Sequence, residues 1–182
     1  GLGDVYKRQG LVGPAIIKVA EGYKLGVQAV NPNCDVYTAY TGSTEDVQKS
    51  KEAAQAMIDK GVDLIGGGGN ASNAGMIKAC EEAGVYAFGE LEQQNLAPET
   101  VIFCNMNNIE NLVLQAVKDT IDGDFQGCIR EYGIAADVAQ LTEYNSHVPQ
   151  EVKDKLAECM DQMRSGELDI PMITEISDDI IH

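Results

Sequence analysis

The fold class follows from residues 44–67, which read TEDVQKSKEAAQAMIDKGVDLIGG. Thr44 is a typical helix N-cap, Glu45 and Asp46 suit the first turn of a helix, and Gly61 suits its end. The pattern therefore predicts a helix from Thr44 to Gly61. The run VDLIGG that follows is typical of a buried strand. A helix that leads directly into a buried strand is the repeating unit of an α/β fold.

The same alternation extends along the chain in both directions. Its periodicity predicts further helices and strands, with Ser72 capping one of the helices. The helices are expected at 14–30, 72–84, 108–123 and 148–167, and the strands at 35–41, 86–90, 100–106 and 127–134. Helices between successive strands predict a parallel sheet flanked by helices on both faces, so the fold class is α/β.

Ligands of such sheets bind beyond the carboxyl ends of the strands. Four polar or glycine-rich loops follow strands in this sequence, and we call them the rim: residues 41–44, 66–73, 89–94 and 105–108. They predict a small-molecule site. The alternative is that these loops are ordinary turns and helix caps, which explains Thr44 and Ser72 equally well.

Composition excludes several classes of partner and cofactor. The 182 residues include 13 basic and 29 acidic side chains, a net charge of −16 that disfavours nucleic acids and anionic membranes. No apolar run approaches the roughly 20 residues of a spanning helix, so any membrane attachment is expected through a lipid anchor outside this chain. The five cysteines are widely spaced without a C-x-x-C pair, which predicts small buried side chains and no zinc site.

The motifs of common enzymes are not found in this sequence. The segment GGGGNASN, residues 66–73, matches neither G-x-G-x-x-G nor a P-loop, so a dinucleotide cofactor is not expected. Ser43 has no companion histidine, and Glu90 and Glu92 have no evident partner for acid–base catalysis. These residues favour a binding protein without cofactor or metal.

The order of the motifs resembles one known family. EGYKLGVQAVNP, VYTAYTGS, KEAAQAMIDKGVDLI, ACEEAGVYAFG, LAPETVI and VPQEVKDKLAECMDQMRSGELDIP are similar, in register, to the basic membrane protein family. These are nucleoside-type substrate-binding lipoproteins of ABC importers. The resemblance implies a two-lobed type I periplasmic-binding-protein fold. Residues 10–182 would then supply most of the C-terminal lobe, with about 100–130 contributing to the hinge and the N-terminal lobe, which is otherwise missing.

The resemblance also implies a ligand site. Its expected residues are Ser43, Thr44, Asn70, Ser72, Glu90 and Asn107. The family often has an aromatic residue at the position of Thr44, an aspartate at Glu90 or Leu91, and a lysine at Asn107. Because stacking and charged contacts are lost at these positions, we expect a smaller or more polar ligand than a purine nucleoside.

The function implied by the resemblance is that of an extracytoplasmic solute-binding component of an ABC importer. The intact protein would be lipid-anchored at the cell membrane, with a small-molecule ligand and a transporter permease as partners. A ligand-sensing regulatory or receptor domain of the same fold remains an alternative, and an α/β enzyme is a weaker one.

The first nine residues, GLGDVYKRQ, do not suit the buried first strand of such a lobe, since they include Asp4, Lys7 and Arg8. They match, residue for residue, a translation of the end of a common transposase sequencing adapter. We therefore interpret residues 1–9 as an adapter artefact on a truncated gene fragment, and expect them to lie outside the sheet.

Overall fold

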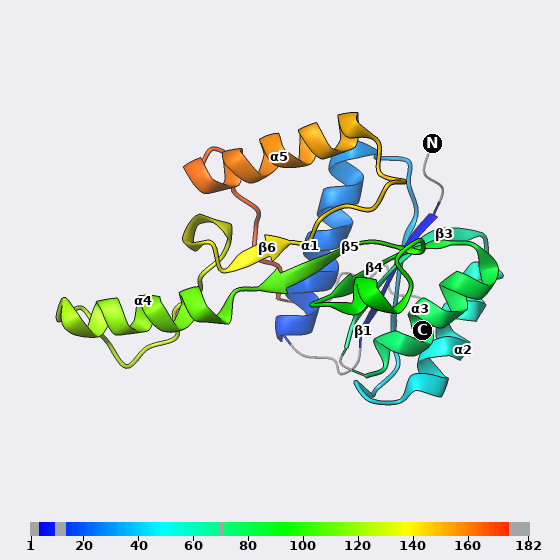
Figure 1. Ribbon diagram of the computed structural model, residues 1–182, viewed down its shortest axis with the longest axis horizontal. Coiled ribbons are helices and arrows are strands. Elements are labelled where there is room, and N and C mark those ends of the chain that lie inside the picture. The colour runs from blue at the N-terminus through cyan, green and yellow to red at the C-terminus, as the bar shows by residue number, and fades with distance from the viewer. Residues whose placement is uncertain (1–3, 10–13, 70, 175–182) are drawn as a thin grey trace.

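The computed structural model describes residues 4–9, 14–69 and 71–174, and its centre is one six-stranded sheet (Figure 1). The strands are β1 Asp4–Gln9, β2 Val36–Tyr40, β3 Val62–Gly68, β4 Tyr86–Glu90, β5 Val101–Asn107 and β6 Ala139–Leu141. The helices are α1 Pro14–Val30, α2 Val47–Ile58, α3 Asn73–Ala83, α4 Ile109–Ile121 and α5 Gln150–Ser165, with short 3-10 turns η1 Gln93–Leu96 and η2 Ile134–Ala136.

The strand order is β2-β1-β3-β4-β5-β6. All neighbouring pairs are parallel except β5 and β6, which run antiparallel. The predicted α/β class with a parallel sheet flanked by helices is confirmed, and the short antiparallel strand β6 is an addition at one edge. The sheet places the rim at the carboxyl ends of β2, β3, β4 and β5, as expected for parallel strands.

Helices cover both faces of the sheet. Phe88 of β4 lies against Tyr23 of α1, with ring centroids 5.0 Å apart. The preceding residue, Ala87, belongs to the buried cluster formed with α2 and α3. Successive strand residues point to opposite faces, so α1 lies on one face and the α2–α3 pair on the other.

The core lies between the sheet and the α2–α3 pair. Its members are apolar side chains from these two helices, from β3, β4 and β5, and from the residue after η1, namely Ala54, Val62, Ile65, Met76, Ile77, Ala79, Cys80, Ala87, Ala97, Val101 and Cys104. The two helices cross closely at Gly75, where an added Cβ would lie 2.0 Å from the carbonyl oxygen of Val47. Burial of three cysteines, Cys34, Cys80 and Cys104, confirms the sequence prediction for them, but Cys128 is exposed.

The two predicted caps have different outcomes. Helix α2 begins later than expected because Asp46, not Thr44, is the N-cap: its Oδ1 accepts a hydrogen bond from the Lys49 amide at 2.9 Å. Ser72 is at the N-cap position of α3, as predicted, but its backbone angles are helical and its side chain makes no capping bond. An aspartate at the junction therefore satisfies the first turn of α2 better than the threonine two residues earlier.

The expectation that residues 1–9 lie outside the sheet is wrong for Asp4–Gln9. These residues form β1, which pairs with β2 and β3 in the interior of the sheet. Strand pairing uses backbone groups that every non-proline residue carries, so the charged side chains of this segment do not prevent it. Pairing of the backbone does not test where the nine residues come from, so the adapter interpretation stays a prediction.

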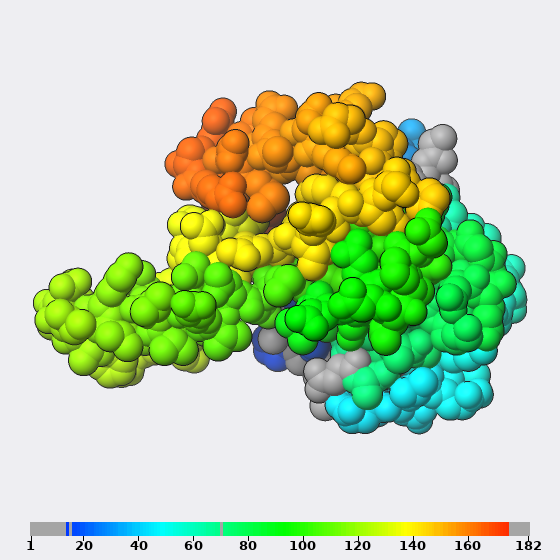
Figure 2. Space-filling model, in the orientation of Figure 1, coloured from blue at the N-terminus to red at the C-terminus, as the bar shows by residue number. Residues whose placement is uncertain are grey.

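The strand predicted at 127–134 does not form. Residues 127–133 are irregular, and the chain rejoins the sheet only at β6. Together with α4 they form a projection, residues 108–133, that we call the arm (Figure 1). Figure 2 shows the arm standing out from the body of the molecule.

Candidate functional site

The rim loops that follow β2 and β3 lie against each other. The Ser72 amide donates to the Thr44 carbonyl at 3.0 Å. A Cβ added to Gly69 would lie 3.8 Å from the Cα of Thr44, an ordinary van der Waals distance, so the two loops are in contact range. The tertiary fold therefore brings Thr44 and Ser72 together across 28 positions of sequence.

Ser43 stabilises the turn before α2. Its Oγ accepts from the Glu45 amide at 3.2 Å and the Asp46 amide at 3.1 Å, while its carbonyl accepts from Thr41 Oγ1 at 3.1 Å. The hydroxyl of Ser43 still has one proton to donate. Its primary role in this structure is to shape the loop, with a single donor left for a ligand.

Thr44 and Ser72 differ in their access to a ligand. Thr44 is half-buried and its hydroxyl donates to the Glu45 carboxylate at 3.3 Å. Ser72 is only 2% exposed, so it supports the loop from within. The remaining predicted residue of this loop, Asn70, lies outside the described residues.

Glu90 ends β4 and closes the site on the side of the glycine loop. Its Oε2 accepts from the Gly69 amide at 3.3 Å, and its own amide donates to Gln93 Oε1 at 3.0 Å. The next residue, Leu91, has φ +55°, a left-handed conformation that is strained for a residue with a γ-branched side chain. Strain of this kind persists where surrounding contacts hold the loop. The left-handed backbone at Leu91 turns the chain away from the sheet immediately after Glu90.

Asn107 lies apart from the other predicted residues. It is exposed at the end of β5, two positions beyond Asn105, which is the register partner of Glu90. Asn107 lines a separate hollow of about 680 Å³ at the root of the arm, together with Tyr132 and Ile170. The structure therefore gathers Ser43, Thr44, Ser72 and Glu90 but leaves Asn107 at the arm.

Two buried or half-buried amides, Asn73 and Gln93, lie in the predicted rim loops but were not among the expected ligand residues. Asn73 is 1% exposed and donates to Gln93 Oε1 at 3.0 Å. Gln93 occupies a loop that the sequence marks only as polar. The available signal was the spacing of Gln93 three residues after Glu90, which lets a tight turn at residues 91–92 bring the side chain back to the strand end.

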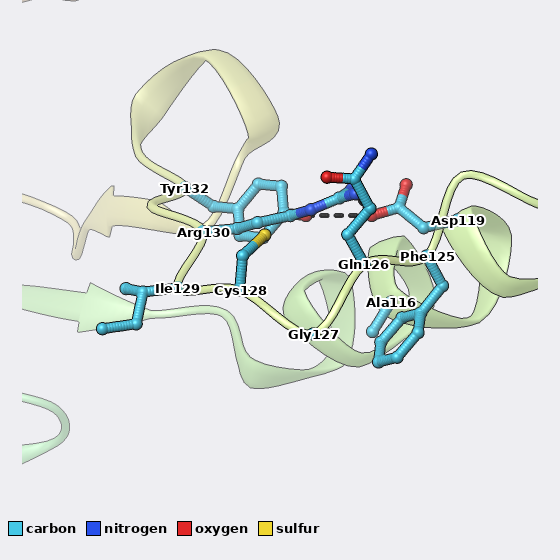
Figure 3. Close-up of a pocket in the computed structure, with 9 residues that line it drawn as sticks. All are labelled: Ala116, Asp119, Phe125, Gln126, Gly127, Cys128, Ile129, Arg130 and Tyr132. Atoms are coloured by element: carbon cyan, nitrogen blue, oxygen red, sulfur yellow. Dashed lines mark hydrogen bonds and ion pairs between the residues drawn. The ribbon is translucent and has the colours of Figure 1, made fainter.

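A second polar cluster lies inside the arm (Figure 3). Asp119 of α4 accepts from Gln115 Nε2 at 2.9 Å and Tyr132 OH at 3.1 Å, and it pairs with Arg130. Arg130 also donates to the Asp124 carbonyl. The bonds from Gln115 and Tyr132 and the adjacent guanidinium hold the pKa of Asp119 below its usual value. This cluster fastens the returning chain to α4.

The described residues form neither a metal centre nor a membrane-spanning helix. Among them, no group of three or more histidine, cysteine, aspartate or glutamate side chains is arranged to hold a metal ion. In the same part of the chain, none of the helices has both the length and the apolar character needed to cross a membrane.

The decisive comparison is with protein families. Residues 2–174 match the model of the Bmp family, described as ABC transporter substrate-binding protein PnrA-like. The chain belongs to this family. Because the Bmp family consists of substrate-binding proteins, the sequence-based prediction of a non-enzyme is confirmed.

Individual relatives support the same assignment. A purine-binding protein of Brucella abortus is 26% identical over 156 residues, which is 85% of this chain and 44% of that protein. The chain spans about half the length, or less, of the curated relatives it matches most strongly.

Solved structures show the fold. A solute-binding protein of an ABC transporter from Conexibacter woesei superposes with a TM-score of 0.80 at 21% identity, covering 96% of this chain and 59% of that one. A transcriptional activator of the comK gene from Bacillus halodurans gives 0.81 at 21% identity, covering 92% and 58%. These likenesses confirm the fold predicted for a periplasmic-binding-protein lobe.

Proposed function

We propose that this Bmp-family chain is one lobe of an extracytoplasmic solute-binding protein, which delivers a small polar solute to the permease of an ABC importer. The arrangement of Thr44, Glu90 and the Gly69 amide supports this proposal. It sets a hydroxyl, a carboxylate and a glycine backbone at one point of the rim, beyond the carboxyl ends of the strands.

The ligand proposed here is held by hydrogen bonds more than by stacking. The rim loops 41–44, 66–69 and 89–94 carry no aromatic side chain, and Thr44 stands where the family often has one. Glu90 supplies a carboxylate acceptor, whose Oε2 accepts from the Gly69 amide. A solute with several hydroxyl or amino donors matches these acceptors, and a nucleoside would bind here mainly through its sugar.

Calorimetry on the intact protein, this lobe joined to its partner lobe, tests the proposal with a panel of nucleosides and monosaccharides. We expect Glu90→Gln to weaken binding about tenfold or more, because a hydrogen bond to a charged group is worth about 1.5–3 kcal/mol. Glu92→Gln is the matched control, since Glu92 is an exposed neighbour. Thr44→Tyr should strengthen binding of purine nucleosides by adding a stacking surface.

Two outcomes would contradict different parts of the proposal. Submicromolar binding of guanosine or inosine by the unaltered protein would exclude an altered ligand preference. Failure of every solute in the panel to bind, or equal binding by the Glu90→Gln variant, would remove the assignment of the site to this rim.

The second half of the cleft is proposed to come from a further lobe, to which residues of about 100–130 contribute. Helix α4 supports this because its polar side chains face the rest of the chain and its apolar side chains face outward. Its inner face, toward the returning chain, carries Asn111, Gln115 and Asp119. Its outer face exposes the large apolar residues Ile109, Val113, Leu114, Val117 and Ile121. An apolar stripe of this width on a helix is ordinarily packed against another element.

Comparison of this chain with the longer protein tests that packing. We expect Val117→Ala to change the unfolding free energy of this chain by less than about 0.5 kcal/mol, as is usual at a surface position. In the longer protein the same change should cost about 0.5–1.5 kcal/mol or more, the cost of removing buried methyl groups. Equal small effects in both proteins would contradict the proposal.

A ligand-sensing regulatory or receptor domain is the second candidate, favoured by the likeness to the transcriptional activator from Bacillus halodurans. The segment that precedes the lobe in the intact protein separates the two functions. A lipid-attachment cysteine after a signal peptide supports the importer and its membrane anchor, whereas a helix-turn-helix or a signalling module supports the regulator or receptor.

A further inference from the structure

The 3-10 turn η1 carries two adjacent glutamines whose side chains bind different parts of the lobe. Gln93 reaches the rim. Its Oε1 accepts two hydrogen bonds at 3.0 Å, one from Asn73 Nδ2 at the start of α3 and one from the Glu90 amide at the end of β4. A single carbonyl oxygen thus ties together the two rim loops that hold the proposed ligand contacts.

The position of Gln93 is closely packed. A Cβ added to Gly89 would lie 3.1 Å from Gln93 Oε1 and 3.2 Å from Cys104 Sγ. Its partner Asn73 is 1% exposed, and burial raises the pKa of the Cys104 thiol, consistent with a dry environment beneath the rim. Gln93 therefore has little room to move independently of Glu90.

Gln94 binds the chain that returns from the arm. Its Nε2 donates to the carbonyl oxygens of Val101 at 3.3 Å and Glu143 at 3.1 Å. Its Oε1 accepts from Thr142 Oγ1 at 3.2 Å. Consecutive residues of a 3-10 turn point about 120° apart, which explains how neighbouring glutamines reach opposite partners.

The segment that Gln94 holds is part of the crossover between the arm and the lobe. Thr142 follows β6 directly, its amide donates to the Cys104 carbonyl at 2.9 Å, and its Oγ1 accepts from the Cys104 amide at 2.8 Å. Asn145 continues the contact by donating from its amide to Ile102 at 2.9 Å. The crossover is thus aligned along β5 by backbone bonds and joined to η1 through Gln94.

We propose that η1 couples the rim to the returning crossover, with Gln93 and Gln94 as its positioning residues. The role of this coupling rests on the proposed function. In the intact protein, a shift of Glu90 on ligand binding would be passed through η1 to the crossover, about which the two lobes would close. The coupling itself is a property of this chain without ligand, and coupling free energies act equally in both directions.

Amide hydrogen exchange of the full 182-residue chain, measured by NMR without ligand, tests the coupling. Gln93→Met should speed exchange of the Glu90 amide about tenfold, because that amide loses its acceptor. The decisive observation is at the other side: the Thr142 amide should also exchange about threefold faster. Reciprocally, Gln94→Met should speed exchange at both Thr142 and Glu90. The Ile65 amide, in the core, corrects for any change in global stability.

Two further variants make the result specific. Gln93→Glu keeps the acceptor oxygen on which both rim bonds depend and should retain protection, whereas Gln94→Glu loses the amide donor and should not. Gln55→Met removes an exposed glutamine of α2 that bonds Asp59 and should change neither amide.

Two results would overturn the coupling. In the first, each single variant changes exchange only at the amide next to its own substitution. In the second, the rate increases in a Gln93→Met/Gln94→Met double variant equal the product of the increases in the two single variants. Because the assay contains no ligand, either outcome leaves the calorimetric test of the proposed function unaffected.

Discussion

The lobe and the arm distribute polar and apolar side chains in opposite ways. In the lobe, Ile65 and Val101 are fully buried while charged side chains of α2 lie outside. In the arm, Asp119 is 9% exposed whereas Ile121 and Ile129 are 77% and 95% exposed. The lobe has the organisation of a unit that folds by its own hydrophobic core, while the arm has the organisation of an element that needs a neighbour.

The largest effect should separate the two regions directly. Ile65→Ala should lower the unfolding free energy by about 2–5 kcal/mol, because it removes buried methyl groups from the core and leaves a cavity. Ile121→Ala, the same change on the arm, should alter it by less than about 0.5 kcal/mol. Urea unfolding measures both, and similar losses at the two positions would break the comparison.

The close crossing of α2 and α3 allows a second contrast, between two helical glycines. Gly75→Ala should cost about 1–3 kcal/mol, because the new methyl group meets the Val47 carbonyl and forces the helices apart. Gly22→Ala in α1 is the control, since a Cβ there meets no atom within 4 Å. That change should instead stabilise the protein by about 0.5–1 kcal/mol through helix propensity. A stabilising Gly75→Ala would show that the crossing is loose.

Acid should loosen the arm before the lobe. The pKa of Asp119 is lowered in the folded protein from its ordinary value of 3.8. Its ionised side chain therefore stabilises the arm fully at pH values above 3.8, and this stabilisation is lost as the pH falls through the folded-state pKa. The Asp124 amide donates to the Asp119 carbonyl, so its protection factor, the intrinsic exchange rate at each pH divided by the observed rate, should then fall while core amides such as Ile65 stay protected.

Two variants sharpen the acid experiment. Asp119→Asn should show fast exchange of the Asp124 amide even at neutral pH, because Arg130 loses its ionic partner. Asp122→Asn, at an exposed position of the same turn, should behave as the unaltered chain. An arm equally protected in the Asp119→Asn variant would show that the cluster does not hold it.

The smallest effect concerns the junction of the two regions. Lys18 of α1 and Glu131 of the arm form an ion pair between partly exposed side chains. A double-mutant cycle with Lys18→Ala and Glu131→Ala should give a coupling of about 0.2–1 kcal/mol. The coupling should decrease in high salt because exposed charges are screened. A coupling above that range, insensitive to salt, would mean that the arm is fixed to the lobe more firmly than its contacts indicate.

Sequence reasoning succeeded where a pattern is local and repeated. The helices at 14–30 and 108–123 and the strand at 86–90 were predicted closely, because apolar periodicity and end signals such as Gly84 are properties of neighbouring residues. Four of the six expected site residues also lie together at the rim, because strand ends of a parallel sheet share one edge. Their ligand contacts stay a prediction.

Sequence reasoning failed where distant partners decide the conformation. Residues 127–134 alternate like a strand, yet Arg130 and Tyr132 point to Asp119, and the pairing with β5 is made by Ala139–Leu141 instead. Asp4–Gln9 read as unsuited to a buried strand, yet its backbone fills the position between β2 and β3. A three-residue strand and a charged strand carry too little local signal to be recognised without their partners.

The sequence by itself determined the α/β class, the rim and the family resemblance, since each depends on residue types at short spacing. Only the tertiary structure decided that Gln93 and Gln94 join the rim to the crossover, and that α4 turns its polar face inward. The glutamines bond segments 20–49 positions away, and α4 bonds the returning chain 11–26 positions away. Hydrogen bonds across such separations leave no periodic pattern in the sequence.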